Sequence, residues 1–182
     1  MSDVVVDACC MLNLIASGHY FSKDEPSSNQ PHQLSVPDVV VAELLFVYQP
    51  DPDDSEKLLK APAGVQELID EGVLSSCSLH SGDESDLFVR LAVRLDDGEA
   101  ACLAIAKHRS LTLATDDRVA RRISNELSVD VLGTPELVRS WAEHCDVSPA
   151  ILAESISNIQ RLAKFVPRPG TTYADWWFKN SE

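Results

Sequence analysis

Four positions in the sequence carry a carboxylate that the packing of an ordinary α/β protein would not need. Each of them follows, opens or interrupts an apolar segment, and they are Asp7, Glu43, Glu99 and either Asp116 or Asp117. Carboxylates that converge in a small volume repel one another unless a cation neutralises them. Oxygen ligands without nearby histidine or cysteine favour Mg²⁺ or Mn²⁺, and Mg²⁺ commonly binds phosphate oxygens as well. These acids therefore indicate metal-assisted hydrolysis of a phosphate ester.

Polar neighbours of these acids are secondary candidates for the same site. Asn13 could orient a metal-bound water, and Thr115 could hydrogen-bond Asp7 or a metal-bound water, or could simply satisfy the backbone at the end of a strand. The remaining candidates are Asp96 and whichever of the two adjacent aspartates is not the principal one.

Each acid also has a structural interpretation that does not exclude a role in metal binding. Asp7 lies between a strand and a helix, where it could serve as a helix N-cap. Asp96 and Glu99 match a capping box, in which Glu99 reaches back to the start of its helix. Glu43 could turn its carboxylate to solvent.

The charge balance limits the partners that the protein could bind. Fifteen Lys and Arg residues against 29 Asp and Glu give a net charge of −14, which argues against a nucleic-acid coat protein or a membrane-surface protein. Any basic patch must be local. Arg118, Arg121 and Arg122 fall on neighbouring parts of one expected helix and could hold phosphates, although each could equally pair with a surface acid.

The cysteines and the N-terminal segment indicate a cytoplasmic protein. The five cysteines are odd in number and scattered, without a CxxC pair, so we expect free thiols in a reducing compartment. Asp3 and Asp7 interrupt the N-terminal apolar run, which is unlike a signal peptide, and no segment is long enough to span a bilayer.

The segments that position the acids alternate between strands and helices. We expect a strand at residues 4–6 that leads into a helix, a polar loop over 22–33, a helix from Pro37 and Asp38 through VVVAELLFVY, and an acidic turn over 50–56. We further expect helices over residues 65–71, 85–94, 98–108, 117–127, 135–144 and 149–164, and strands within 73–79, 111–114 and 129–132.

This alternation predicts an α/β fold in which helices flank a central parallel sheet. The carboxyl ends of parallel strands meet at one edge, where such sheets bind ligands, so Asp7 and the Asp116–Asp117 pair should lie together. We expect residues 1–147 to form this domain. Residues 148–182 should add a helix and a tail whose Trp176, Trp177 and Phe178 pack on the domain or on a partner.

Four stretches of the sequence resemble the PIN-domain family, and specifically its VapC-like toxin branch. They cover residues 4–133 and read VVVDACCMLNLIASG, VPDVVVAELL, LDDGEAACLAIAKHRSLTLATDDRVARRI and VDVLGT. The third is the most specific, because an acid that opens an alanine-rich helix is followed by a strand and then by Thr-x-Asp.

The resemblance implies a three-layer PIN-like fold and a metal-dependent ribonuclease. It implies that a quartet of acids, Asp7, Glu43, Glu99 and Asp117, holds Mg²⁺ or Mn²⁺ for the cleavage of RNA by a metal-activated water. It also implies a toxin whose partner is a protein antitoxin with a basic segment, and it implies a possible homodimer.

Two other functions stay open at this point. Aspartyl-phosphate chemistry of the haloacid-dehalogenase type would also use an acid after the first strand, but it would need an aspartate where Cys9 stands. A non-catalytic PIN module that binds a protein partner would remain functional after Asp7→Asn.

Overall fold

The computed structural model describes residues 2–22, 30–80 and 82–181. The described chain divides into two compact units: the first contains residues 2–11, 31–44 and most of 65–134, and the second contains the rest. Each unit is described by itself. The division expected from the sequence, after residue 147, stays a prediction.

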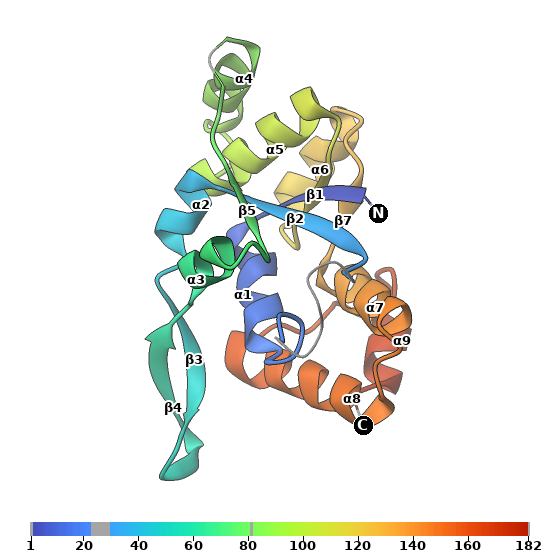
Figure 1. Ribbon diagram of the computed structural model, residues 1–182. Coiled ribbons are helices and arrows are strands. Elements are labelled where there is room, and N and C mark those ends of the chain that lie inside the picture. The colour runs from blue at the N-terminus through green and yellow to red at the C-terminus, as the bar shows by residue number, and fades with distance from the viewer. Residues whose placement is uncertain (1, 23–29, 81, 182) are drawn as a thin grey trace. The chain divides into compact units, whose positions relative to one another are not determined.

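The first unit is built on a parallel sheet that has five strands within the described residues, in the order β5-β2-β1-β6-β7 (Figure 1). The strands are β1 (Ser2–Val6), β2 (His32–Pro37), β5 (Ser75–Cys77), β6 (Thr112–Ala114) and β7 (Val131–Leu132). β1 pairs with β6 so that Val6 lies opposite Ala114. The residues that follow these two strands therefore emerge at the same edge of the sheet.

Helices flank this sheet, as the sequence predicted. They are α2 (Asp38–Glu43), α3 (Val65–Asp70), α4 (Asp83–Leu91), α5 (Asp97–Arg109) and α6 (Arg118–Glu126). α5 contacts β1, β2 and β6, and its residues from Ala100 to Ala106 are buried. A helix that is apolar on all sides is typical of such a buried position, and alanine allows close approach to the sheet. The predicted α/β fold class is confirmed.

The second unit contains a β-hairpin and the C-terminal helices. Its elements are the end of α1 (Ala8–Ala16), β3 (Phe46–Asp51), β4 (Asp54–Pro62), α7 (Thr134–His144, from Pro135 on), α8 (Pro149–Asn158), the π-helical η2 (Ile159–Ala163) and α9 (Ala174–Lys179). In the tail, the buried ring of Trp177 meets Phe165 edge-on at 5.6 Å between centroids. Trp177 thus packs within its own unit, whereas Phe178 is exposed.

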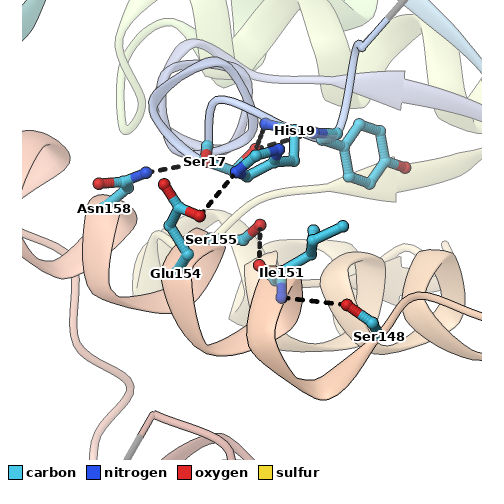
Figure 2. A network of polar contacts seen from close by, with 8 residues as sticks. Ser17, His19, Ser148, Ile151, Glu154, Ser155 and Asn158 are labelled. Carbon is cyan, nitrogen blue, oxygen red and sulfur yellow. Dashed lines mark hydrogen bonds and ion pairs between the residues drawn. The ribbon is translucent and has the colours of Figure 1, made fainter. Parts of the chain in front are cut away.

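Polar contacts join α8 to the loop that follows α1 (Figure 2). The side-chain amide of Asn158 donates to the carbonyl of Ser17 at 3.3 Å, and the imidazole Nε2 of His19 lies 3.4 Å from a carboxylate oxygen of Glu154. α8 begins as the sequence predicted, with Ser148 accepting from the backbone N–H of Ile151 and proline at the first helical position. The expected single helix over 149–164 is interrupted, because its last turn is the π-helix η2.

Several expected elements are wrong between residues 30 and 62. The helix expected through VVVAELLFVY ends at Glu43, and Phe46–Asp51 is instead the strand β3, paired antiparallel with β4. A short apolar run rich in β-branched and aromatic residues fits a helix or a strand equally well, and here pairing with a distant segment decides. The acidic turn is shorter than expected, because β3 and β4 extend into it.

The start of β2 also differs from the sequence-based expectation. β2 begins at His32, so the polar loop expected over residues 22–33 ends earlier than predicted. Most of that loop, residues 23–29, lies outside the described residues. In the part of the chain that the structure describes, no helix combines the length and apolar character needed to cross a membrane.

Candidate active site

Asp7 follows β1 and is almost completely buried, with 2% of its surface exposed. Its backbone N–H donates to the carbonyl of Ala114, which continues the pairing of β1 with β6. Its carboxylate accepts from the backbone N–H of Cys10 at 2.8 Å, as a residue at the start of α1 should. The thiol of Cys9 lies 3.2 and 3.3 Å from the two carboxylate oxygens. Asp7 is therefore both a helix cap and a buried acid at the edge of the sheet.

Thr115, the first residue after β6, hydrogen-bonds both to Asp7 and to β7, the strand on the other side of β6. Its backbone N–H donates to the carbonyl of Leu132 at 3.0 Å. Its hydroxyl accepts from the backbone N–H of Asp117 at 3.1 Å and hydrogen-bonds the carboxylate of Asp7. Since the hydroxyl has a single proton, that proton goes to Asp7. The expected contact between Thr115 and Asp7 is present.

The two adjacent aspartates after Thr115 make different contacts. Asp117 is the N-cap of α6, and its Oδ1 accepts from the backbone N–H groups of Val119 and Ala120 at 2.6 and 2.8 Å. Oδ2 of Asp117 accepts no hydrogen bond from the described residues. Asp117 can thus cap the helix with one oxygen and present the other to a ligand.

Asp116 uses both of its carboxylate oxygens within the fold. Oδ1 accepts from the backbone N–H of Thr134 at 3.0 Å, and Oδ2 accepts from the Thr134 hydroxyl at 2.5 Å. The thiol of Cys10 also donates to Oδ2, at 3.3 Å. Asp116 therefore joins the end of β6 to the start of α7 and to α1.

Glu99 lies in the first turn of α5, where the predicted capping box forms. The side chain of Asp96 accepts from the backbone N–H of Glu99 at 2.8 Å, and the Glu99 carboxylate in turn accepts from the backbone N–H of Asp96. Burial raises the pKa of Glu99 to about 7, and the carboxylates of Asp96, Asp117 and Asp7 raise it as well. The negative charges of Asp7, after β1, and Asp117, after β6, thus both disfavour the ionised form of Glu99.

Glu43 is the last residue of α2, and its exposed side chain lies against the start of α5. A Cβ placed on Gly98 would lie 2.8 Å from Oε2 of Glu43 and 3.3 Å from Oε1. The carboxylate therefore occupies space that only a glycine leaves free. Desolvation raises the pKa of Glu43, and the nearby Asp96 and Asp97 raise it further.

Electrostatics link these acids to one another. Burial raises the pKa of Asp7 to about 6, and the carboxylate of Asp116 adds to this, while hydrogen bonds from Thr115, Cys10 and Cys9 act in the opposite direction. Raised pKa values on neighbouring acids mean that the cluster resists its own full ionisation. A cation would remove that penalty.

The donor set fits a hard divalent cation. Its side chains are carboxylates, which suit Mg²⁺ and Mn²⁺. Across residues 2–22, 30–80 and 82–181, no three or more His, Cys, Asp or Glu side chains form a ready group of metal ligands. Mg²⁺ commonly takes one or two carboxylates and keeps several waters, so such a cation does not require a closed set of protein ligands.

The three arginines proposed to hold phosphates differ in their contacts. Arg121 donates from Nη1 to the carbonyl of Thr115 at 2.9 Å, so it supports the loop that carries the acids. Arg122 lies 3.9 Å from a carboxylate oxygen of Glu126. Arg118 is exposed directly after Asp117 and has no hydrogen bond or ion pair within the described residues. Arg118 is therefore the cation best able to accept a new anionic partner.

Asn13 belongs to the second unit and is buried, with 4% of its surface exposed. Its proposed role in orienting a water stays a prediction. Gly98, Cys10 and Thr134 are not among the residues expected from the sequence. The glycine between two acids in LDDGEA and the threonine at the helix start in LGTP were the available signals.

Comparison with known proteins supplies the family. No curated protein matches the chain at a significant level. A family model described as a PIN domain matches residues 3–150, which include Asp7, Glu43, Glu99 and Asp117. The match covers most of the 182 residues, and the chain therefore belongs to the PIN-domain family.

Proposed function

We propose that this protein is a metal-dependent endoribonuclease that hydrolyses RNA phosphodiesters at the site around Asp7. PIN domains are generally nucleases, which supports phosphodiester chemistry. The observation that carries the proposal is the pairing of β1 with β6, because it places Asp7 and Asp117 at one edge of the sheet, where Thr115 hydrogen-bonds both residues. The nearby carboxylates of Asp117 and Asp7 also raise the pKa of Glu99 in α5. The proposed cation ligands are Asp7, Glu43, Glu99 and Asp117.

Each residue at the proposed site would have a different role in the hydrolysis of RNA. A bound Mg²⁺ or Mn²⁺ would supply a water of lowered pKa and neutralise charge on the leaving oxygen. Asp7 is held in one orientation by donors from Cys10, Cys9 and Thr115. Asp117 is held through Oδ1 by the first turn of α6, which leaves Oδ2 for the cation. Arg118 would contact an RNA phosphate next to the scissile one.

The aspartyl-phosphate alternative receives no support from the surroundings of Asp7. That chemistry would need a second aspartate at position 9, whereas the thiol of Cys9 contacts the Asp7 carboxylate.

The direct test is cleavage of a fluorescent RNA by the purified protein with Mg²⁺, Mn²⁺ or a chelator. We expect chelator to abolish cleavage, and we expect Asp7→Asn and Asp117→Asn to lower it by at least about 100-fold. Asp130→Asn is the matched control, because it removes an exposed carboxylate from the same unit. Metal-dependent cleavage that survives both site variants would contradict the assignment of the acids.

We further propose that the protein is a VapC-like toxin with a protein antitoxin, and that it forms a homodimer. The acidity of the chain suits a basic antitoxin segment. Induced expression of the wild type should arrest bacterial growth, whereas expression of Asp7→Asn at the same level should not. Growth that is unaffected by an active ribonuclease would contradict the toxin role.

Light scattering on the purified protein tests the proposed homodimer. A monomeric mass at micromolar concentration would contradict the homodimer.

A further inference from the structure

The contacts of Asp116 separate its role from that of Asp117. Both of its oxygens are engaged by Thr134, and one also accepts from the thiol of Cys10. Thr134 is fully buried, as is Cys10. A carboxylate that satisfies three donors from two helices is already committed to the fold. Hydrogen bonds to both oxygens fix the position of this carboxylate at the end of β6.

Asp116 lies in the chain between Thr115 and Asp117, both of which belong to the proposed cation site. The preceding residue, Thr115, donates its hydroxyl proton to Asp7, and the following residue, Asp117, caps α6 with Oδ1 and leaves Oδ2 without a donor among the described residues. Because planar peptide units join Asp116 to both neighbours, anchoring Asp116 restricts where the Cα atoms of Thr115 and Asp117 can lie. Asp116 is fixed by Thr134, which lies 18 residues further along the chain.

A second contact ties the same anchor to α1. Cys10 donates its backbone N–H to Asp7 and its thiol to Asp116. One residue of α1 thus contacts the acids after both β1 and β6. Burial raises the pKa of the Cys10 thiol well above its usual value, so the thiol keeps its proton and stays a donor.

We infer that Asp116 is a positioning residue, which acts with Thr134 and Cys10 to hold Thr115 and Asp117 at the cation site. This inference rests on the proposed function. It assigns different roles to two adjacent aspartates that are chemically identical in the sequence. It also makes Thr134, a residue of α7, part of the support of the site.

The test compares Mn²⁺ affinity across variants by electron paramagnetic resonance, which detects free and bound Mn²⁺ without any RNA. Loss of a residue that supports a ligand typically lowers metal affinity by about 10- to 100-fold. We expect Asp116→Asn and Thr134→Val each to fall in that range, whereas Thr134→Ser, which keeps the hydroxyl, should bind as the wild type does. Asp117→Asn should lose measurable binding.

The double variant Asp116→Asn/Thr134→Val distinguishes positioning from independent effects. Because both changes break the same contact, its affinity should be no lower than that of Asp116→Asn alone. Asp130→Asn should leave affinity unchanged, and thermal unfolding of each variant identifies any that fails to fold. If Thr134→Val alone fails to fold, the comparison of Asp116→Asn with Asp117→Asn still tests the positioning role of Asp116.

Three results would overturn the inference. Asp116 would be a cation ligand if Asp116→Asn lost Mn²⁺ binding as completely as Asp117→Asn while Thr134→Val bound Mn²⁺ normally. Asp116→Asn that binds as the wild type does would remove its positioning role. A wild type that neither binds Mn²⁺ nor cleaves RNA would reject the proposed function and the inference together, and this outcome is distinct from the other two.

Discussion

The carboxylate of Glu43 rests on Gly98, so close that a Cβ at position 98 would lie 2.8 Å from its Oε2. Gly98 directly precedes Glu99 in the first turn of α5. The absence of a side chain at this one position therefore leaves room for the carboxylate of Glu43 against the start of α5. Glu43 thus lies against the residue that directly precedes Glu99, which is the next member of the proposed quartet.

Gly98→Ala should disturb the site more than the fold. The methyl group would displace the end of a flexible, exposed glutamate, and alanine is the better helix former, so the melting temperature should change little. Mn²⁺ affinity and RNA cleavage should each fall about 10-fold, as for an indirect disturbance of a metal ligand. In a Glu43→Ala background the same change should have no further effect. An additional loss in that background would show that Gly98 acts independently of Glu43.

Asp7→Asn should stabilise the metal-free protein at pH 8. The folded protein raises the pKa of Asp7 from 3.8 to about 6, so ionisation of Asp7 opposes folding. Stability from this group is complete below pH 3.8 and is lost as the pH rises through 6. Above that pH the penalty corresponds to roughly 3 kcal/mol at most. Urea unfolding in chelator at pH 4 and pH 8 measures it, and a variant less stable than the wild type at pH 8 would contradict the burial penalty.

Mn²⁺ should raise the melting temperature of the wild type more at pH 8 than at pH 5. Asp7 and Glu99, whose pKa values are about 6 and 7, are largely protonated at pH 5 and must lose protons to bind a cation. Differential scanning fluorimetry at both pH values checks this, with Asp7→Asn as the control that should respond weakly at either. Equal stabilisation of wild type and variant would place the bound Mn²⁺ elsewhere.

Glu84→Gln should destabilise the first unit at neutral pH. Arg109 donates to both carboxylate oxygens of Glu84 at 2.8 and 2.9 Å, and this bidentate pair lowers the pKa of Glu84 from 4.5 to about 2. The stability is present above pH 4.5 and is lost as the pH falls toward 2. We expect a loss of roughly 2 to 3 kcal/mol at pH 7, measured by urea unfolding. Glu126→Gln, which breaks exposed pairs only, should change stability by less than about 1 kcal/mol.

Arg118→Ala should weaken RNA binding without weakening Mn²⁺ binding. Arg118 is exposed beside Asp117, and each phosphate contact that is lost should reduce the slope of log Kd against log salt by about 0.7 to 1. Fluorescence anisotropy with the uncleaving Asp7→Asn protein measures this. Arg122→Ala should have the smaller effect, since Arg122 already lies near Glu126. An unchanged salt slope for Arg118→Ala would remove it from the RNA interface.

The sequence predicted those parts of the fold that depend on local pattern. The capping box at Asp96 and Glu99, the buried helix α5 and the strand β6 follow one another closely, and each has its own signal. The hairpin of β3 and β4 depends on pairing between segments, such as Tyr48 opposite Lys60, which no single window of sequence contains. The roles of Asp116 and Asp117 could not be separated for the same reason, because Thr134 makes the distinction.

The measurement closest to the central claim is anomalous diffraction from crystals of the protein soaked in Mn²⁺. We predict one or two Mn²⁺ peaks bound by Asp7 and Asp117, with Glu43 and Glu99 in direct or water-bridged contact and Asp116 still bonded to Thr134. Peaks only at other carboxylates, in crystals of a protein that cleaves RNA in Mn²⁺, would contradict it.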